Sequence, residues 1–422
     1  MRVGSKEGRM TKEEFYRDAR PGSVGPLEGV VVIEACTTYA GPVAGAELAD
    51  MGAEVIKCEL PGTGDICRLF GPKVPNAPEA DNGAPFLSIN RNKKSITLNF
   101  HHAKGQEIFR RLASRADIVL ENFRPGAMSK WNIGYEQVCQ MKPDIVYVSL
   151  SCLGQWGPLS HKVGYDTDAQ AMSGIMSVTG LPDGPPTKVG NAIVDYLSGV
   201  KAAQAALAAY VRRLRTGEGQ WVDVAMVDSA LSVTEGGMMH AAMNGEVWKR
   251  NGNRHPSSAP CNSFRCVDGE VMLAVAHDRQ WQRLCQLIGR EDLMHDQRTG
   301  NIAARKANEP FVEQVVAAWA RTQRVQDVVA TLNAESISCS PILDFGQIVK
   351  EEHFRVRESV AEIQHPTAGN LTHYGTAPKF SRTRTGVRSA APRLGQHNAD
   401  IYGQWLGYDA KELAELVGAG II

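Results

Sequence analysis

One carboxylate in the sequence has the surroundings of a nucleophile. Asp195 follows the apolar residues 192–194 and precedes a helix predicted from about residue 199 to 215. Spacing alone favours a structural role, because an acid at a helix N-terminus stabilises the helix by roughly 0.5–2 kcal/mol. The same position would keep a carboxylate ionised and partly shielded from water, which suits a nucleophile. Asp166 and Asp168 compete for this role, although both fit the first turn of another predicted helix.

Polar segments next to predicted strands are the next candidates for a site. Residues 121–126 follow the strand predicted at 117–120, and residues 149–158 begin at the last residue of the strand predicted at 144–149. Residues 90–95 lead into the strand predicted at 95–98. Ligands of open parallel sheets bind outside the carboxyl ends of the strands, so the first two segments fall where a site is expected. Taken singly, each of these segments is more often a solvated turn.

The loop after the first predicted strand lacks a glycine-rich phosphate motif. Residues 37–42 read Thr-Thr-Tyr-Ala-Gly-Pro rather than GxGxxG, which disfavours a classical dinucleotide site. Pro42 suits the first turn of a helix, whose free N–H groups can face an anion. A phosphate-bearing ligand and a plain strand-to-helix turn therefore both stay open. The sequence has no GxxxxGK[ST] motif, which argues against a ligase driven by a nucleoside triphosphate.

Short apolar strands alternate with amphipathic helices over the first half of the chain. Strands are predicted at residues 29–33, 54–57, 95–98, 117–120 and 144–149, and helices at 43–51, 105–116, 135–141, 166–176 and 199–215. Apolar strands that alternate with helices are typical of a parallel, doubly wound sheet covered on both faces. The predicted fold class is therefore α/β.

The pattern changes after residue 225, which predicts several domains. We expect an N-terminal extension (1–26), a large domain (27–225), a linker (226–262), a small α+β domain (263–345) and a C-terminal segment that returns to the large domain (346–422). The small domain is predicted from a strand at 271–275 and helices near 281–288 and 311–320. The last segment contains a strand-like stretch at 373–380.

Composition and charge narrow the classes of function. The 422 residues include 46 basic and 46 acidic side chains, so no basic surplus favours nucleic acid or a membrane surface. The N-terminal residues lack the apolar core of a secretory signal, and no apolar run approaches the ~20 residues of a transmembrane helix, which predicts a cytoplasmic protein. Nine scattered cysteines and the lack of metal-ligand spacing predict neither disulfides nor a metal site.

Taken together, the motifs resemble those of the class III CoA-transferases, a family that includes formyl-CoA transferase, the carnitine CoA-transferases and, on the same fold, α-methylacyl-CoA racemase. The similarity runs in order from about residue 27 to 230 and continues more weakly to the C-terminus. The segments that carry it are 40–42 (AGP), 48–57 (LADMGAEVIK), 92–95 (NKKS), 121–126 (ENFRPG), 154–158 (GQWGP), 164–166 (GYD), 170–174 (QAMSG), 217–224 (GEGQWVDV), 252–256 (GNRHP) and 377–380 (APKF).

The resemblance implies a Rossmann-like large domain, a small domain and two interlocked protomers. It places the nucleophilic aspartate at Asp195. The CoA-binding residues that it implies are Tyr39, Ala40, Leu98, Asn99, Phe100, His101, Asn122, Phe123, Lys130 and Tyr165. The implied substrates are CoA thioesters and a free carboxylic acid, with no permanently bound cofactor. A heteromer with a paralogous subunit is the alternative to a homodimer.

Two positions depart from the family pattern. Leu60 stands where the family often has an arginine that contacts CoA. Lys93, Arg124 or Lys130 is therefore expected to bind the nucleotide part of CoA in place of that arginine. The consecutive-glycine loop that shields intermediates in formyl-CoA transferase is replaced by residues 254–260.

Three functions fit this resemblance. CoA transfer needs a carboxylate nucleophile, which Asp195 supplies. Racemisation needs two opposed acid/base groups, and the family's histidine in Gly-His-Asp is Tyr165 here. Tyrosine is a poor base at neutral pH, since its reference pKa is about 10, so transfer is favoured. A CoA-binding, non-catalytic subunit is the third function, which the presence of Asp195 disfavours.

The acids that are exchanged are the least specified part of the function. The resemblance makes succinyl-CoA a candidate donor and a dicarboxylate or substituted succinate a candidate acceptor. Arg254 and His255, in the segment that replaces the glycine loop, could hold a distal carboxylate, and an aromatic acid stays open as an alternative.

Overall fold

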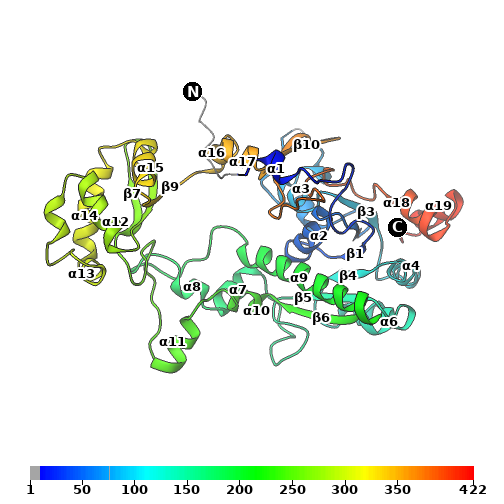
Figure 1. Cartoon of the computed structure of the whole chain (residues 1–422). Coiled ribbons are helices and arrows are strands. Elements are labelled where there is room, and N and C mark those ends of the chain that lie inside the picture. Colours follow the sequence, from blue (N-terminus) through cyan, green and yellow to red (C-terminus); the bar gives the residue numbers. More distant parts are fainter. Residues whose placement is uncertain (1–9, 76) are drawn as a thin grey trace. The chain divides into compact units, whose positions relative to one another are not determined.

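The computed structural model describes residues 10–75 and 77–422 (Figure 1). The first nine residues of the predicted N-terminal extension lie outside this range. The chain divides into a large unit, with residues up to Ile175, Val189–Met238 and Glu352–Ile422, and a small unit, with Met176–Lys188 and Met239–Glu351. The domain bounds predicted from the sequence stay a prediction beside this division.

A six-stranded sheet forms the centre of the large unit, and its neighbouring strands are all parallel. The strands are β1 (Val31–Ala35), β2 (Glu54–Glu59), β3 (Lys93–Thr97), β4 (Ile118–Glu121), β5 (Val146–Ser151) and β6 (Gln220–Ala225). Their order is β3-β2-β1-β4-β5-β6, which is that of a Rossmann-like fold. The predicted α/β class with a parallel sheet is confirmed. The strand order reverses between β1 and β4, where such sheets bind ligands.

Helices cover the sheet and continue into the C-terminal part of the large unit. They are α1 (Lys12–Phe15), α2 (Ala40–Asp50), α3 (Ala84–Ile89), α4 (Ala103–Ala113), α5 (Ala127–Lys130), α6 (Tyr135–Met141), α7 (Asp166–Met172), α9 (Ile193–Thr216), α10 (Met226–Leu231), α17 (Glu352–Val356), α18 (Asn398–Asp400) and α19 (Ala410–Gly418). Short helical turns are η1 (Ile66–Leu69), η2 (Glu79–Asp81) and η4 (Ile401–Trp405). The helices α8 (Ile175–Val178) and α11 (Gly237–Asn244) lie where the chain passes between the two units.

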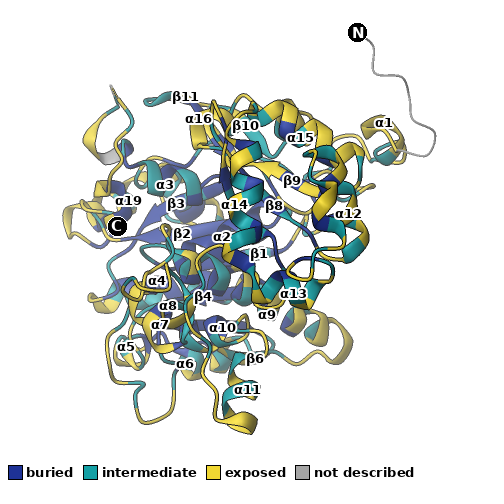
Figure 2. Ribbon diagram, turned by 90° about the vertical axis from the view of Figure 1, so that its left-hand side faces the viewer, coloured by how far each residue is buried: buried dark blue, intermediate teal, exposed yellow. Residues whose placement is uncertain are grey.

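Two apolar cores lie on opposite faces of the sheet. Successive strand residues point to opposite faces, so Val32 joins the core under α2 and α9, whereas Ile33 joins the core under α4 and the C-terminal helices. In Figure 2 the strands β1, β2 and β3 of this sheet are drawn mainly in the dark blue of buried residues. A Cβ added at Gly199 would lie 2.7 Å from the Ala40 carbonyl oxygen and 2.6 Å from Val43. This close contact fixes the start of α9 beside the loop that follows β1.

Several elements differ from the sequence prediction; the helix predicted at residues 166–176, for example, is α7, which ends at Met172. The helix α9 begins at Ile193 rather than near residue 199, so Asp195 lies inside its first turn. The C-terminal segment forms an antiparallel hairpin of β10 (Val360–His365) and β11 (Gly369–Tyr374), where a strand-like stretch was predicted at 373–380. Gly369, at φ +76°, supplies the left-handed backbone that the tight turn requires.

The small unit is built around a three-stranded antiparallel sheet. Its strands are β7 (Cys261–Arg265), β8 (Glu270–Ala274) and β9 (Ser338–Pro341), and its helices are α12 (Asp278–Leu287), α13 (Ile302–Ala307), α14 (Glu309–Ala320), α15 (Val325–Ala334) and α16 (Phe345–Ile348), with the turn η3 (Glu291–Met294). Trp281 lies in its apolar core. Among the described residues, no helix combines the length and apolar character needed to cross a bilayer.

Candidate functional site

The loops after β1 and β4 are joined where the strand order reverses. The side-chain amide of Asn122, just after β4, donates to the Thr37 carbonyl oxygen at 2.8 Å and accepts from the Thr37 N–H at 2.9 Å. Tyr39 and Ala40, at the start of α2, follow this anchored residue directly. The structure therefore brings three of the predicted CoA-binding residues to the expected edge of the sheet.

The loop after β1 contains a strained residue. Thr38 has φ +63°, a left-handed conformation that is costly for a β-branched side chain and that recurs at functional sites. The Asp65 carboxylate accepts from the Thr38 N–H and from the Thr37 hydroxyl, both at 3.1 Å. Asp65 therefore holds the strained backbone that leads into Tyr39.

A buried cluster of charges lies beneath this loop. The Lys57 ammonium lies 3.0 Å from Glu34 and 2.9 Å from Asp65, and it donates to the Cys36 carbonyl oxygen at 2.9 Å. Burial alone would lower the pKa of Lys57, but the carboxylates of Asp65, Glu34 and Glu59 outweigh burial and raise it. Burial also opposes the charge of Asp65, yet Lys57 holds the pKa of Asp65 below its usual value. The two groups are thus a charged pair that fixes the loop.

Asp195 lies in the first turn of α9 but does not cap it. The carboxylate of Asp166 accepts from the Val194 N–H at 2.8 Å and from the Asp195 N–H at 3.3 Å, so Asp166 is the acceptor for these helix-terminal amides. Burial, followed by the charge of Asp166, raises the pKa of Asp195 to about 7. The structural role that spacing favours for Asp195 therefore belongs to Asp166, which leaves the Asp195 side chain without a capping role.

Three side chains from other elements lie close enough to Asp195 for its charge to raise their pKa. They are Tyr39 before α2, Cys67 in η1 and Cys152 after β5. Burial is the main cause of their raised pKa values, and in each of them the negative charge of Asp195 contributes. The carboxylate thus lies among weakly acidic groups that stay neutral at pH 7.

A cluster of aromatic rings forms a second part of the site. The Trp131 ring lies 4.9 Å from that of His101, 5.0 Å from that of Phe123 and 6.1 Å from that of Phe100, measured between centroids. Lys130 is next to Trp131 in the chain and is exposed. Aromatic faces beside a cation suit a nucleotide base and its phosphates.

The remaining predicted CoA-binding residues have different environments. The Leu98 side chain is buried in the core, so only its backbone faces the strand end. Asn99 is tied to the C-terminus, because its N–H donates to the Ile421 carbonyl oxygen at 2.8 Å. Tyr165 precedes Asp166 at the start of α7, and its side chain is 65% exposed.

Two basic residues named from the sequence are not free. Lys93 is buried, and its ammonium lies 2.7 Å from Glu34. The expectation that Lys93 helps to bind the nucleotide part of CoA is therefore wrong. Burial lowers the pKa of Lys93 to about 8. In the small unit, Arg254 makes a two-bond contact with Glu313, at 2.9 and 2.7 Å, so a substrate carboxylate would have to compete with Glu313 for it.

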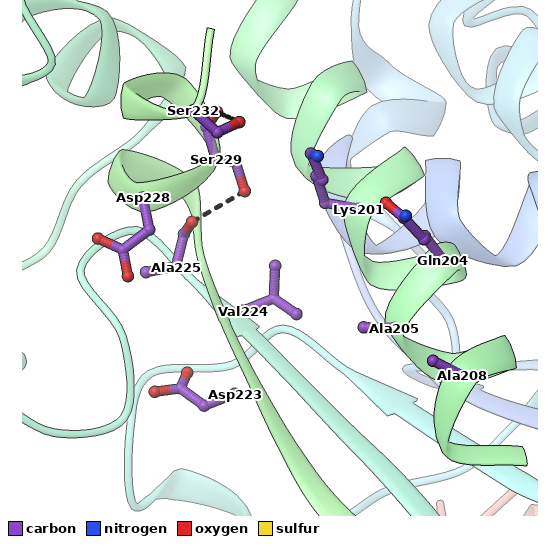
Figure 3. Close-up of a pocket in the computed structure, with 10 residues that line it drawn as sticks. All are labelled: Lys201, Gln204, Ala205, Ala208, Asp223, Val224, Ala225, Asp228, Ser229 and Ser232. Carbon is purple, nitrogen blue, oxygen red and sulfur yellow. Dashed lines mark hydrogen bonds between the residues drawn. The ribbon is translucent and has the colours of Figure 1, made fainter. Parts of the chain in front are cut away.

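A groove of about 450 Å³ lies between α9 and the β6–α10 segment of the large unit (Figure 3). Lys201, Gln204 and Ala208 line it from α9. With 3.6 residues per turn, these positions lie on a different face of α9 from Asp195. None of the predicted CoA-binding residues lines this groove.

Sequence reasoning missed several residues that the fold brings to the site. Asp65, Cys67 and Trp131 are the main ones: Asp65 and Cys67 bond to Thr38, the neighbour of Tyr39, and the Trp131 ring contacts that of Phe123. A glycine-rich turn followed by an acid at Asp65 is a recognisable signal for a helix start. Trp131 carries no such signal. No cluster of three or more metal-ligand side chains is found within residues 10–75 and 77–422.

Comparison with known proteins shows which family the chain belongs to. The model of CoA-transferase family III matches residues 27–398. A succinyl-CoA–D-citramalate CoA-transferase from Chloroflexus aurantiacus is 34% identical over 94% of this chain and 98% of its own length. A succinyl-CoA:mesaconate CoA-transferase from Haloarcula hispanica is 36% identical over 90% of this chain and 96% of its own length. A CAIB/BAIF family protein from Brucella suis has a crystal structure with a TM-score of 0.83 and 33% identity, over 90% of this chain and 100% of that one.

Proposed function

The chain belongs to CoA-transferase family III, and from this premise we propose that it moves CoA from succinyl-CoA to a dicarboxylic acid through a thioester on Asp195. The observation that carries the proposal is the buried Asp195 carboxylate at the start of α9, whose helix-capping role Asp166 fills. The charge of Asp195 contributes to the raised pKa of Tyr39, which lies in the loop at the reversal of strand order, where Rossmann-like sheets bind ligands.

The proposed reaction exchanges bonds in four steps. The Asp195 carboxylate attacks the carbonyl of the donor thioester, the C–S bond breaks, and a mixed anhydride and the CoA thiolate form. The thiolate attacks the Asp195 carbonyl of the anhydride, which releases the donor acid and leaves CoA on Asp195 as a thioester. The acceptor carboxylate then attacks that thioester, and the freed thiolate attacks the acceptor side of the new anhydride. One thioester replaces another, so no nucleoside triphosphate is consumed.

The residues of the large unit have separate roles in this proposal. The aromatic rings around Trp131, together with Lys130, would hold the nucleotide part of CoA. Tyr39, Ala40 and Asn122 would line the path to Asp195. Burial around Asp195 would keep water from the anhydride until the thiolate captures it.

The substrate class comes from the relatives. Those from Chloroflexus aurantiacus and Haloarcula hispanica are named for succinyl-CoA and for D-citramalate or mesaconate. Another relative, from Mus musculus, is a succinyl-CoA:glutarate CoA-transferase, 33% identical over 95% of this chain and 91% of its own length. These names support a dicarboxylate acceptor for this chain.

Incubation with succinyl-CoA and no acceptor tests the proposal. Intact-mass spectrometry should show an adduct of CoA minus water, because the thiolate captures the anhydride before water does. Hydroxylamine should remove the adduct, and a panel of citramalate, mesaconate, glutarate and an aromatic acid should discharge it as the matching acyl-CoA. A racemase would instead exchange the α-proton of a 2-methylacyl-CoA with deuterium and form no adduct. That outcome, or neither reaction, would overturn the proposal.

The assembly is part of the same proposal. The family resemblance implies an interlocked homodimer without a permanently bound cofactor, and the sequence predicts a location in the cytoplasm. Threaded chains cannot separate without extensive unfolding, so dilution should not yield a folded monomer. Sedimentation that shows a well-folded monomer at submicromolar concentration would contradict the interlocked dimer. A mixed dimer with a paralogous chain would instead appear as a second subunit in native mass spectrometry.

A further inference from the structure

We propose that Asp166 is the positioning residue of the nucleophile: its carboxylate holds the first turn of α9 and places a negative charge beside Asp195. The inference rests on the proposed function of Asp195 and deepens it. Asp166 begins α7, is 7% exposed, and reaches α9 across 28 residues of sequence.

Both oxygens of Asp166 are engaged. One accepts from the Val194 N–H at 2.8 Å and from the Asp195 N–H at 3.3 Å. The other accepts from the side-chain amide nitrogen (Nε2) of Gln170 at 2.6 Å. The side-chain oxygen (Oε1) of Gln170 in turn accepts from the Val189 N–H at 2.9 Å. The helix-capping residue itself, Ala192, has no side chain able to accept these bonds. Asp166 therefore fixes the backbone from which the Asp195 side chain projects.

The charge of Asp166 reverses the usual effect of a helix start. Free N–H groups at a helix N-terminus stabilise a nearby carboxylate. Here those N–H groups bond to Asp166, and its negative charge faces Asp195. Within residues 10–75 and 77–422, Asp166 is the one charged group that shifts the pKa of Asp195 appreciably, and the neighbouring groups whose pKa the charge of Asp195 helps to raise, Tyr39, Cys67 and Cys152, are not cations. Burial and the Asp166 charge together raise the pKa of Asp195 to about 7.

A more basic carboxylate attacks a thioester faster, at the cost of being protonated in acid. In the wild-type protein, kcat/KM should rise with pH through about 7, as the Asp195 carboxyl ionises. We call this rise of kcat/KM with pH the acidic limb of the pH profile. In Asp166→Asn, the midpoint of the acidic limb should move down by about one pH unit, because only the charge of Asp166 is removed and the burial of Asp195 remains. The rate at pH 8 should fall several-fold, since the nucleophile is less basic.

Two matched variants separate charge from packing. Asp168→Asn makes the same change of charge on the same helix, where the carboxylate accepts from the Tyr165 N–H at 2.9 Å, and it should leave the acidic limb in place. Gln170→Ala removes a bond to Asp166 but keeps its charge, so it should lower stability without moving the limb. An unmoved limb in Asp166→Asn, or the same movement in either control, would overturn the proposal. If Asp166→Asn does not fold, Asp166→Ser supplies a capping hydroxyl without the charge.

A second measurement does not need transfer activity. Because burial and Asp166 disfavour the ionised carboxylate, Asp195→Asn should raise the Tm at pH 8 and should not raise it below about pH 4, where the carboxyl is protonated in both folded and unfolded states. The rise at pH 8 should be smaller in an Asp166→Asn background. Equal rises in both backgrounds would contradict the coupling, whereas coupling without any CoA adduct would contradict only the proposed function.

Discussion

Asp195→Ala is expected to reduce CoA transfer by at least ~10³-fold, because a methyl group cannot form the anhydride or the thioester. The variant should keep the fold, since Asp166 and not Asp195 caps α9. Incubated with succinyl-CoA, it should gain no covalent mass. Stopped-flow or single-turnover transfer assays with wild-type protein as reference measure the loss.

CoA binding provides the control for this variant. Tyr39, Asn122 and the rings around Trp131 are unchanged in Asp195→Ala, so calorimetry should give a Kd for CoA close to that of the wild-type protein. Transfer at near-wild-type rates would exclude Asp195 as the nucleophile and would make Asp166 the next carboxylate to test.

Lys57→Met is expected to lower the free energy of unfolding of the large unit by about 3–5 kcal/mol, because it leaves the buried Asp65 carboxylate without its cation, whereas Glu34 keeps Lys93 at 2.7 Å. Glu34 and Asp65, the two partners of Lys57, have side chains that are at most 1% exposed. The corresponding fall in Tm is on the order of 10 °C. Thermal denaturation followed by circular dichroism measures it.

Lys94→Met is the matched control for Lys57→Met. Lys94 also pairs with an acid, Glu54 at 2.5 Å, but both side chains are more than one-third exposed. Exposed pairs contribute only about 0–1 kcal/mol, so this variant should melt close to the wild-type protein. Lys57→Met should also weaken CoA binding, since Asp65 would lose the partner that helps it to hold Thr38. Equal stability of the two variants would show that the buried cluster does not stabilise the loop.

The sheet was predictable because most of its strands are short runs of apolar, β-branched residues that can be recognised in the sequence. In runs such as residues 29–33 and 144–149, apolar and β-branched residues occupy both faces of the strand. A strand needs apolar residues on both faces only when both faces of its sheet are covered. The predicted helix at residues 135–141 has the observed bounds. The β10–β11 hairpin was missed in part, because β10 carries mixed polar and apolar residues and is only partly buried.

The polar segment at residues 90–95 shows why local sequence misled. Taken singly, it has the composition of a solvated turn, yet Asn90 and Arg91 are buried. Arg91 pairs with Asp50 at 2.5 Å, 41 residues away, and the Asn92 amide donates to the Gly386 carbonyl oxygen, 294 residues away. A polar side chain is buried when a partner satisfies it, and no local pattern records a partner so distant.

The sequence by itself determined the α/β class, the parallel sheet and the family, because these depend on periodicity and on motifs within short segments. It also marked Asp195 as a candidate nucleophile. Only the tertiary structure showed that Asp195 does not cap α9, since the residue that caps this helix, Asp166, lies on another helix. The pKa of a buried group is likewise set by what the fold places around it, and here burial and Asp166 raise that of Asp195 to about 7.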